Sequence, residues 1–274
     1  LLYRDRTLAK IWCMRGTQHM VPSEDLPIFL QGTRQEWLES SAKDLIRQKR
    51  WSRQERLERI YPLLSKILQE GPKARSEVRE SLLAAGIPRV ELSEYGLAKE
   101  SSYLGFTVSG PPLGGIGREP TLALLSQWLP RIDPNSVSAG EAHRILVKRY
   151  FRSYGPASLT DASYFLGMKM SSLQPAFEAI NDEMIQVRVE GEKGEKWITK
   201  DSRKTLDRLD EDLEAPLRFL AAYDQLLLGH KNKTRFVPPK HLKCIYLPSA
   251  NMAHTILLDG TDVGTWRGNK TSQG

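Results

Sequence analysis

The sequence predicts an α+β fold that is mainly helical, built from two similar helical blocks and a small β-rich C-terminal unit. Three observations support this prediction. Apolar residues recur with helical spacing over the first three quarters of the chain, each block ends in two strand-like segments, and short apolar runs separated by turn residues follow Asp201. A chain of 274 residues that is 40% hydrophobic is long enough to bury a core in two or three domains.

The N-terminal part is predicted to be helical after a short extended segment. Ser23 is expected to cap a helix that begins near Glu24, because a serine hydroxyl accepts hydrogen bonds from first-turn amides. The densest basic stretch follows at Arg34–Arg59. Two interpretations of it stay open, a surface for a polyanion or a solvated helix face whose cations pair with Glu36, Glu39 and Glu55.

The first block, residues 52–130, predicts three helices and a β-hairpin. Apolar residues in Ser52–Glu70 form one helical stripe, and Gly71-Pro72 ends that helix. The other expected elements are two helices at Ala74–Ala85 and Leu92–Leu104 and two strands at Gly105–Ser109 and Thr121–Leu125. The GGIG run at Gly114–Gly117 lacks the Gly-Lys-Ser/Thr sequence of a phosphate loop, so it indicates only a flexible loop between the strands.

The second block, residues 138–200, repeats this order after the linker Pro130–Ala139. The expected elements are helices at Glu141–Tyr154, from Ser158 or Thr160 to Phe165, and from Ser171 or Ser172 to Ile180, then strands at Met184–Glu190 and Lys196–Thr199. Three helices followed by a β-hairpin make a winged helix. The sequence therefore predicts tandem winged-helix domains, with residues 1–51 as the remainder of an N-terminal winged-helix or helical unit.

The pattern changes in residues 201–274. A charged connecting helix is predicted at Asp201–Leu213, and the apolar runs LRFLAAY, KCIYL, HTILLDG and DVGTW then indicate a small β-rich unit. Asp259-Gly260 predicts a tight hairpin turn between strands at Thr255–Leu258 and Asp262–Trp266. The last residues, GNKTSQG, carry no packing pattern.

Charge and composition favour a cytoplasmic protein with a polyanionic partner. The net charge is +7, and each Lys or Arg placed near a phosphate releases a condensed counterion. No apolar run approaches the length of a membrane helix, so no membrane partner is expected. Cys13 and Cys244 lie in apolar surroundings and are expected to be buried thiols, without a disulfide or a metal.

Two segments near the ends of the chain carry a family resemblance. Ile11–Leu26, with the sequence IWCMRGTQHMVPSEDL, and Ala221–Arg267, from AAYDQLLLGHKNKTRF to DGTDVGTWR, resemble matching segments of the winged-helix AlkZ/YcaQ-like DNA glycosylases. The resemblance implies a protein that binds duplex DNA, alkylated or crosslinked, and a family that excises bulky or crosslinked N-alkylated purines in DNA repair. It implies no small-molecule cofactor.

The catalytic motif of that family is Gln-aliphatic-Gln or Gln-aliphatic-Asp. The resemblance places this motif upstream of the Arg-Gly-Thr-x-His segment, which begins here at Arg15. The nearest candidates, QWL at Gln127 and QVR at Gln186, do not match it. The catalytic residues are therefore expected upstream of Leu1, and the chain is expected to be a fragment shortened at both ends.

Three residues of the first segment are candidates for contact with DNA. Gly16 next to Arg15 allows close backbone approach, while Thr17 and His19, two residues apart, share one face. A guanidinium, a hydroxyl and an imidazole together can bind a phosphate or an extruded nucleotide. The residue pattern alone favours a hydrogen-bonded structural role for His19, whereas the resemblance favours a place at a DNA-binding cleft.

The third helix of the second block supplies further candidates. A winged helix lays its third helix in the major groove, and Lys169, Ser171, Ser172 and Gln174 stand at the start of this one. Tandem winged helices also serve as protein-binding or architectural modules, so a non-catalytic DNA-binding or regulatory protein and a purely structural role remain alternatives.

The C-terminal segment supplies the remaining candidates, Asp224, His230, Arg235, Trp266 and Arg267. The resemblance matches Asp224, Arg235 and Arg267 to charged positions of the family, whereas Leu226 stands where a Tyr is common. The alternative is a structural ion pair between Asp224 and Arg235. The five histidines lack zinc-ligand spacing, so no metal site is expected.

Overall fold

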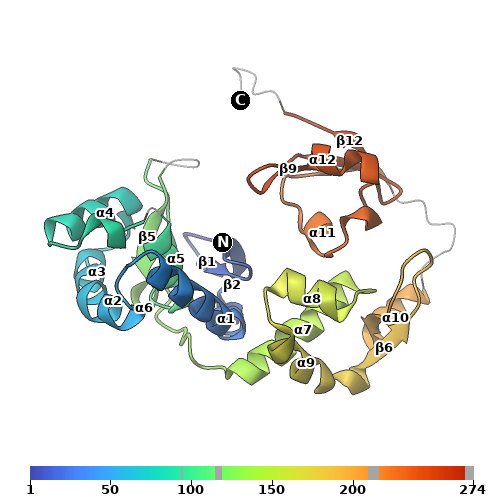
Figure 1. The fold of residues 1–274 in the computed structure, drawn as a ribbon, viewed down its shortest axis with the longest axis horizontal. Coiled ribbons are helices and arrows are strands. Elements are labelled where there is room, and N and C mark those ends of the chain that lie inside the picture. The colour runs from blue at the N-terminus through green and yellow to red at the C-terminus, as the bar shows by residue number, and fades with distance from the viewer. Residues whose placement is uncertain (94, 115–118, 209–215, 269–274) are drawn as a thin grey trace. The chain divides into compact units, whose positions relative to one another are not determined.

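The computed structural model describes residues 1–93, 95–114, 119–208 and 216–268, and it is an α+β structure with mainly helical elements. The chain divides into two compact units (Figure 1). Unit 1 comprises Leu1–Leu146 together with Leu166–Ser172, and unit 2 comprises Val147–Phe165 and Leu173–Gly274. A short segment of the second helical block thus belongs to the unit formed by the first half of the chain.

Unit 1 begins with a β-hairpin and a long helix. Strands β1 (Leu8–Cys13) and β2 (Thr17–Pro22) pair in an antiparallel hairpin. The short 3-10 helix η1 (Ser23–Asp25) follows, and the long helix α1 (Leu26–Arg47) begins directly after it. The predicted capping role of Ser23 is wrong. Its hydroxyl donates to the carbonyl of Arg6 at 2.6 Å, which ties the hairpin to the preceding segment instead.

The predicted helix at Ser52–Glu70 is two helices, α2 (Arg53–Arg59) and α3 (Tyr61–Leu68). The break falls at Ile60 because Pro62, in the first turn of α3, has no amide hydrogen to continue the ladder of α2. Ser52 forms a capping box with Glu55 at the start of α2. The apolar stripe is nevertheless kept, since both helices turn it toward the same core.

The rest of the first block follows the expected order. Its elements are α4 (Arg75–Ala84), η2 (Arg89–Glu91), α5 (Gly96–Tyr103), the strands β3 (Lys73–Ala74), β4 (Thr107–Gly110) and β5 (Thr121–Leu124), and α6 (Leu125–Trp128). The strands form a sheet in the order β3-β5-β4. The helix predicted at Leu92–Leu104 begins only at Gly96, and most of the predicted GGIG loop lies outside the described residues.

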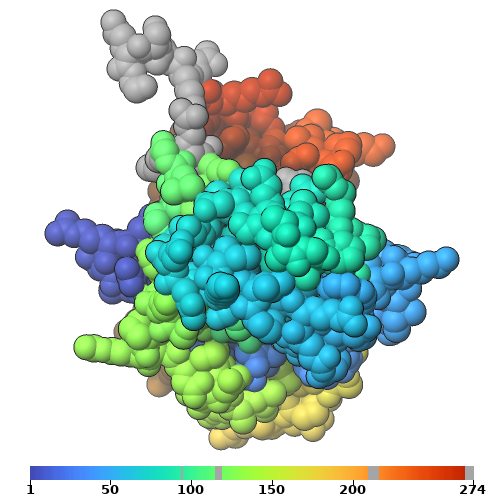
Figure 2. Space-filling model, turned by 90° about the vertical axis from the view of Figure 1, so that its left-hand side faces the viewer, coloured from blue at the N-terminus to red at the C-terminus, as the bar shows by residue number. Residues whose placement is uncertain are grey.

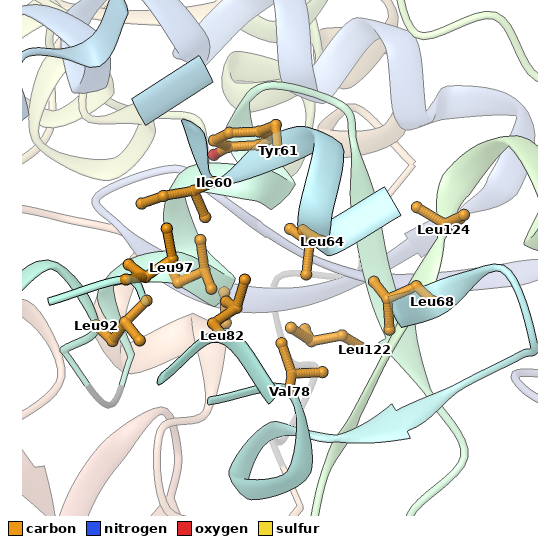
Figure 3. Packing of buried hydrophobic residues seen from close by; sticks show 12 residues of the cluster. Ile60, Tyr61, Leu64, Leu68, Val78, Leu82, Leu92, Leu97, Leu122 and Leu124 are labelled. Carbon is orange, nitrogen blue, oxygen red and sulfur yellow. The ribbon is translucent and has the colours of Figure 1, made fainter. Parts of the chain in front are cut away.

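A leucine-rich cluster holds this block together. Leu64 and Leu68 of α3 and Val78 and Leu82 of α4 meet Leu122 of β5, all 5% exposed or less, and Figure 3 shows their side chains pointing toward one another. Burying a leucine side chain contributes roughly 1.5–3 kcal/mol each. Residues of α2, α3 and α4, coloured cyan, cover the centre of the face drawn in Figure 2.

Beside this cluster the block buries an ionic network that the sequence did not reveal. Arg56, 1% exposed, donates to Glu91 at 2.6 Å and to Glu100 at 2.8 Å. Arg50 and Arg53 lie 3.7 and 3.6 Å from the same two carboxylates. These three arginines come from the basic stretch predicted to be either a polyanion surface or a solvated helix face; here they pair with buried carboxylates instead.

The second block contains α7 (Ala139–Tyr154), α8 (Leu159–Leu166), α9 (Met170–Glu178), η3 (Asn181–Glu183) and the antiparallel strands β6 (Met184–Val187) and β7 (Lys196–Thr199). Ser158 caps α8 as predicted, accepting from the amide of Asp161 at 3.2 Å. Gly167, with φ +70°, forms the predicted turn. Helix α9 begins at Met170, one residue before the predicted serines.

The C-terminal part of unit 2 mixes short helices and strands. Its elements are α10 (Lys200–Leu206), β8 (Arg218–Leu220), α11 (Gln225–Leu228), η4 (Lys233–Arg235), η5 (Pro239–His241), α12 (Leu242–Ile245), β9 (Tyr246–Leu247), β10 (Asn251–Met252), β11 (Thr255–Leu258) and β12 (Thr261–Thr265). Three strands form a sheet in the order β12-β11-β8. Part of the predicted helix at Asp201–Leu213, and most of the final segment, lie outside the described residues.

Two predictions at this end have clear outcomes. The Asp259-Gly260 turn is confirmed, with φ +48° and +70° at the two positions, as a tight hairpin of this kind requires. The KCIYL run is mostly the helix α12, where Ile245 faces the core and Cys244 is exposed. The prediction of a buried Cys244 thiol is therefore wrong, whereas Cys13 is buried and both thiols are free.

Candidate nucleic-acid interface

The turn between β1 and β2 is built from left-handed backbone. The amide of Thr17 donates to the carbonyl of Met14 at 3.2 Å, and the two residues between them, Arg15 and Gly16, have φ +53° and +72°. The two positive φ values are those of a type I′ hairpin turn. Glycine adopts this conformation at little cost, so the Arg-Gly pair sets the shape of the hairpin tip.

The tip rests against the turn between α8 and α9 within unit 1. A Cβ atom added to Gly167 would lie 2.7 Å from the amide nitrogen of Arg15, so only glycine permits this approach. Lys169, two residues on, forms an ion pair with Glu39 of α1, and Ser171 is exposed. The structure thus brings together two of the predicted groups, the hairpin residues and the start of α9.

Thr17 and His19 form a hydrogen-bonded pair on the tip, as their spacing predicts. The Thr17 hydroxyl lies 2.7 Å from His19 Nε2 and donates to the carbonyl of Met14 at 3.2 Å. Because the hydroxyl proton is used for Met14, Nε2 must be the donor to Thr17, which selects one neutral tautomer. Burial, and then the charge of Arg15, lower the pKa of His19 to about 4. The imidazole is neutral at pH 7.

Three side chains that the sequence did not single out complete this corner of unit 1. Trp37 of α1 stacks on Tyr103 of α5, with ring centroids 4.5 Å apart, and the Tyr103 hydroxyl accepts from the amide of Gly16 at 3.1 Å. Lys99 of α5 lies 4.8 Å from the ring of Trp12. No local pattern could have selected them, since they come from helices far apart in the chain.

Next to these residues lies a pocket of about 230 Å³ in unit 1. It opens between α1 and α5 and is lined by two aromatic residues, Trp37 and Tyr95, and by polar groups that include Ser40, Asp44 and Lys99. Burial lowers the pKa of Lys99. The pocket is therefore a mixed aromatic and polar site at the side of the hairpin tip.

The C-terminal candidates lie in unit 2, where four of them have intramolecular partners. Asp224 caps α11, accepting from the amide of Leu226 at 2.9 Å. Arg235 donates to Glu192 at 2.6 Å and to the carbonyl of Pro156 at 2.6 Å, so the alternative ion pair between Asp224 and Arg235 is wrong. Its actual carboxylate partner comes from the loop between β6 and β7.

His230 is 5% exposed, with Nε2 2.9 Å from the carbonyl of Tyr154, and burial lowers the pKa of its imidazole. Together with Arg235 it lines a pocket of about 620 Å³. The indole nitrogen of Trp266 donates to the carbonyl of Leu220 at 2.9 Å, whereas Arg267 and Gln174 are exposed.

The described residues contain no group of three or more His, Cys, Asp and Glu side chains arranged to hold a metal ion. In the same part of the chain, no helix is long and apolar enough to cross a membrane.

Comparison with known proteins identifies the family to which the chain belongs. Residues 1–274 match the family described as DNA glycosylase AlkZ-like. The chain belongs to this family. A relative from Streptomyces sahachiroi, named interstrand DNA cross-link repair glycosylase, is 26% identical over 285 residues, which cover 96% of this chain and 71% of the relative.

The fold of AlkZ-like glycosylases is also recovered in three dimensions. The solved structure of the Streptomyces sahachiroi DNA glycosylase AlkZ aligns with a TM-score of 0.77 and 21% identity, over 95% of this chain and 70% of that one. The two proteins therefore share a fold. The family resemblance predicted from the Ile11–Leu26 and Ala221–Arg267 segments is confirmed.

Proposed function

We propose that this chain binds duplex DNA carrying alkylated or crosslinked purines and serves a DNA glycosylase that excises them in DNA repair. Membership of the AlkZ-like family and the name of the Streptomyces relative support the reaction class. The observation that carries the proposal is the junction in unit 1 at which Arg15 meets the turn before Lys169. It brings the backbone of Arg15 against the turn that precedes Lys169, whose ammonium pairs with Glu39.

We further propose tandem winged-helix domains over residues 52–130 and 138–200, with residues 1–51 as the remainder of an N-terminal unit and 201–274 as a connecting helix and β-rich unit. In each block, three or more helices precede paired strands, which supports this interpretation. The DNA-binding residues would be Arg15, Thr17, His19, Lys169, Ser171, Ser172, Gln174, Asp224, His230, Arg235, Trp266 and Arg267. Of these, Thr17, Lys169, Ser171, Gln174 and Arg267 are exposed, and the half-buried Arg15 carries charge at the tip.

The chemistry of excision explains which residues are needed. Alkylation at N7 gives the purine a positive charge, so the base leaves without a general acid. The enzyme has to stabilise an oxocarbenium-like sugar and position a water molecule. Two carboxamide side chains, or one carboxamide and one carboxylate, can perform both of these tasks. The 274 residues contain no Gln-aliphatic-Gln or Gln-aliphatic-Asp motif, so we propose that this stretch supplies DNA binding and not the reacting groups.

The test compares the 274-residue chain with the same chain carrying whatever coding sequence precedes Leu1. Both are incubated with duplex DNA that contains N7-methylguanine, and the released base is quantified. We expect release by the extended protein alone, with salt-sensitive binding of the duplex by both. The proposal would be refuted if neither the 274-residue chain nor the extended protein bound the duplex.

A second candidate is a DNA-binding regulator without catalysis. The order of helices followed by paired strands in both blocks is compatible with it. Duplex binding without release of the base by either protein would select this alternative.

A further inference from the structure

Another pocket of unit 1, of about 270 Å³, lies between α4, the start of α5 and the start of β5. One side of it is apolar and is formed by buried side chains, each 6% exposed or less: Val78, Leu92, Leu97 and Leu122. These four residues belong to the leucine-rich cluster drawn in Figure 3. Because the cluster already fixes them, the pocket presents a preformed apolar surface to a ligand.

Two arginines of α4 line the same pocket. Arg75 and Arg79 are four residues apart, so their side chains lie on one face of the helix. Like charges at this spacing repel each other and destabilise a helix slightly. The acidic residue between them, Glu77, pairs with Lys73. A bound anion would relieve the repulsion between the two guanidiniums.

Neither guanidinium has an ion-pair partner within residues 1–93, 95–114, 119–208 and 216–268. The guanidinium of Arg75 lies 5.1 Å from the ring centre of Tyr95, which also lines the pocket. Arg79 Nε is shielded from solvent and has no hydrogen-bond partner in the same residues. A shielded donor without a partner is costly, so an acceptor bound in the pocket would stabilise this arrangement.

The charge at the pocket favours an anion. Among the described lining residues there is one carboxylate, Glu119, which accepts from the amide of Ser76 at 2.8 Å and so already serves the first turn of α4. Two guanidiniums and one carboxylate leave a net positive charge. The planar guanidinium matches the geometry of a carboxylate and binds it in short, charge-assisted hydrogen bonds.

We propose that this pocket binds a carboxylate that carries an apolar group, with the carboxylate between Arg75 and Arg79 and the apolar group against the leucine-rich cluster. Its volume lies just below the roughly 300–1,000 Å³ of typical ligand sites. This size limits the ligand to a small organic acid or to the C-terminal residue of a peptide. A DNA backbone offers anionic oxygens but no apolar group for the leucines. The inference does not depend on the proposed DNA binding.

The experiment titrates the 274-residue chain with phenylacetate, phenylacetamide and acetate, and follows the backbone amides of the pocket by proton–nitrogen correlation NMR. We expect phenylacetate to bind roughly ten-fold more tightly than phenylacetamide, which lacks the charge. Acetate, which lacks the ring, should bind at least roughly ten-fold more weakly than phenylacetate.

Three variants assign the charge effect to the pocket. Arg75→Gln and Arg79→Gln should each reduce the preference for the acid over the amide to about two-fold. Arg89→Gln removes an exposed arginine that does not line the pocket, so it is the matched control and should keep the full preference. Circular dichroism confirms that each variant is folded.

The inference would be overturned by equal binding of phenylacetate and phenylacetamide, or by a preference that both pocket variants retain. Displacement of phenylacetate by an equal concentration of inorganic phosphate would also overturn it, because the arginines would then be assigned to phosphates. A further titration with N-acetyl-glycyl-phenylalanine distinguishes the source of the carboxylate. Tighter binding than that of phenylacetate would identify the end of a peptide chain, and weaker binding would identify a free acid.

Discussion

Single basic residues in unit 1 divide into those that pair with a buried carboxylate and those without such a partner among the described residues. Arg56 belongs to the first kind, since its guanidinium satisfies two buried carboxylates, Glu91 and Glu100. Lys99 belongs to the second, because its ammonium lies beside Gly16 with no described carboxylate in reach. Both are basic residues near helices, and only their partners distinguish them.

Replacing Arg56 by Met should strongly destabilise the chain. The substitution keeps the volume of the stem but leaves two buried carboxylates without their main partner, which costs about 3–5 kcal/mol. Arg47→Met, at an exposed pair with Asp44, is the control and should change the free energy of unfolding by less than about 0.5 kcal/mol. Urea denaturation measures both; equal stability of the two variants would refute this account of the network.

The imidazole of His19 should make stability depend on pH. In the folded chain its pKa is about 4, whereas the unfolded chain binds the proton near the ordinary value of 6.5. Stability is therefore fully present above pH 6.5 and falls as the pH drops toward 4. After allowance for partial exposure of the ring, the loss is about 1 kcal/mol. His19→Gln should flatten this slope in denaturation curves recorded between pH 4 and 7, and an unchanged slope would contradict the assignment.

At the level of elements, the decisive contact joins the β1–β2 hairpin to the turn between α8 and α9. Gly167 is required there for two reasons, its φ of +70° and the closeness of the Arg15 amide nitrogen to its missing Cβ. The two segments lie far apart in the sequence, and the sequence predicts them as separate groups of candidate residues.

Gly167→Ala should push this turn away from the hairpin. The left-handed backbone and the steric conflict together should cost about 2–4 kcal/mol. Gly86→Ala is the matched control, because Gly86 has φ +88° and nothing within 4 Å of its missing Cβ. It should lose about 1 kcal/mol in the same denaturation experiment. Similar losses for the two variants would show that the contact with Arg15 is unimportant.

Sequence patterns predicted the elements that local chemistry determines. The cap at Ser158 and the turn at Asp259-Gly260 are confirmed because both depend on neighbouring residues. The helix break at Ile60 was missed, although Pro62 indicates it, because the apolar stripe continues through both helices. For the candidate site, Thr17 and His19 were predicted to share a face and do so.

The remainder of the site depends on contacts between distant segments. Trp37 and Lys99 approach Gly16 only in the folded chain, and no spacing in the sequence encodes that approach. The same holds for Arg235, whose partner Glu192 comes from the loop after β6 and not from the nearby Asp224.

For the whole molecule, family membership and net charge both favour binding to DNA. The chain belongs to the AlkZ-like DNA glycosylases and carries a net charge of +7. Because counterions are released on binding, the logarithm of the DNA-binding constant falls linearly with the logarithm of the salt concentration. The slope is about 0.9 for each phosphate that the protein neutralises. The slope therefore counts the phosphates held by the candidate cations.

The most direct test of the account measures this slope for an alkylated duplex with the wild type and with the double variant Arg15→Gln/Lys169→Gln. We expect the slope to decrease by about 1–2 and the affinity to fall at low salt. The double variant Lys43→Gln/Arg47→Gln, at exposed positions of α1, should leave the slope unchanged. An unchanged slope for the first double variant would show that the hairpin tip and the turn before α9 do not contact DNA.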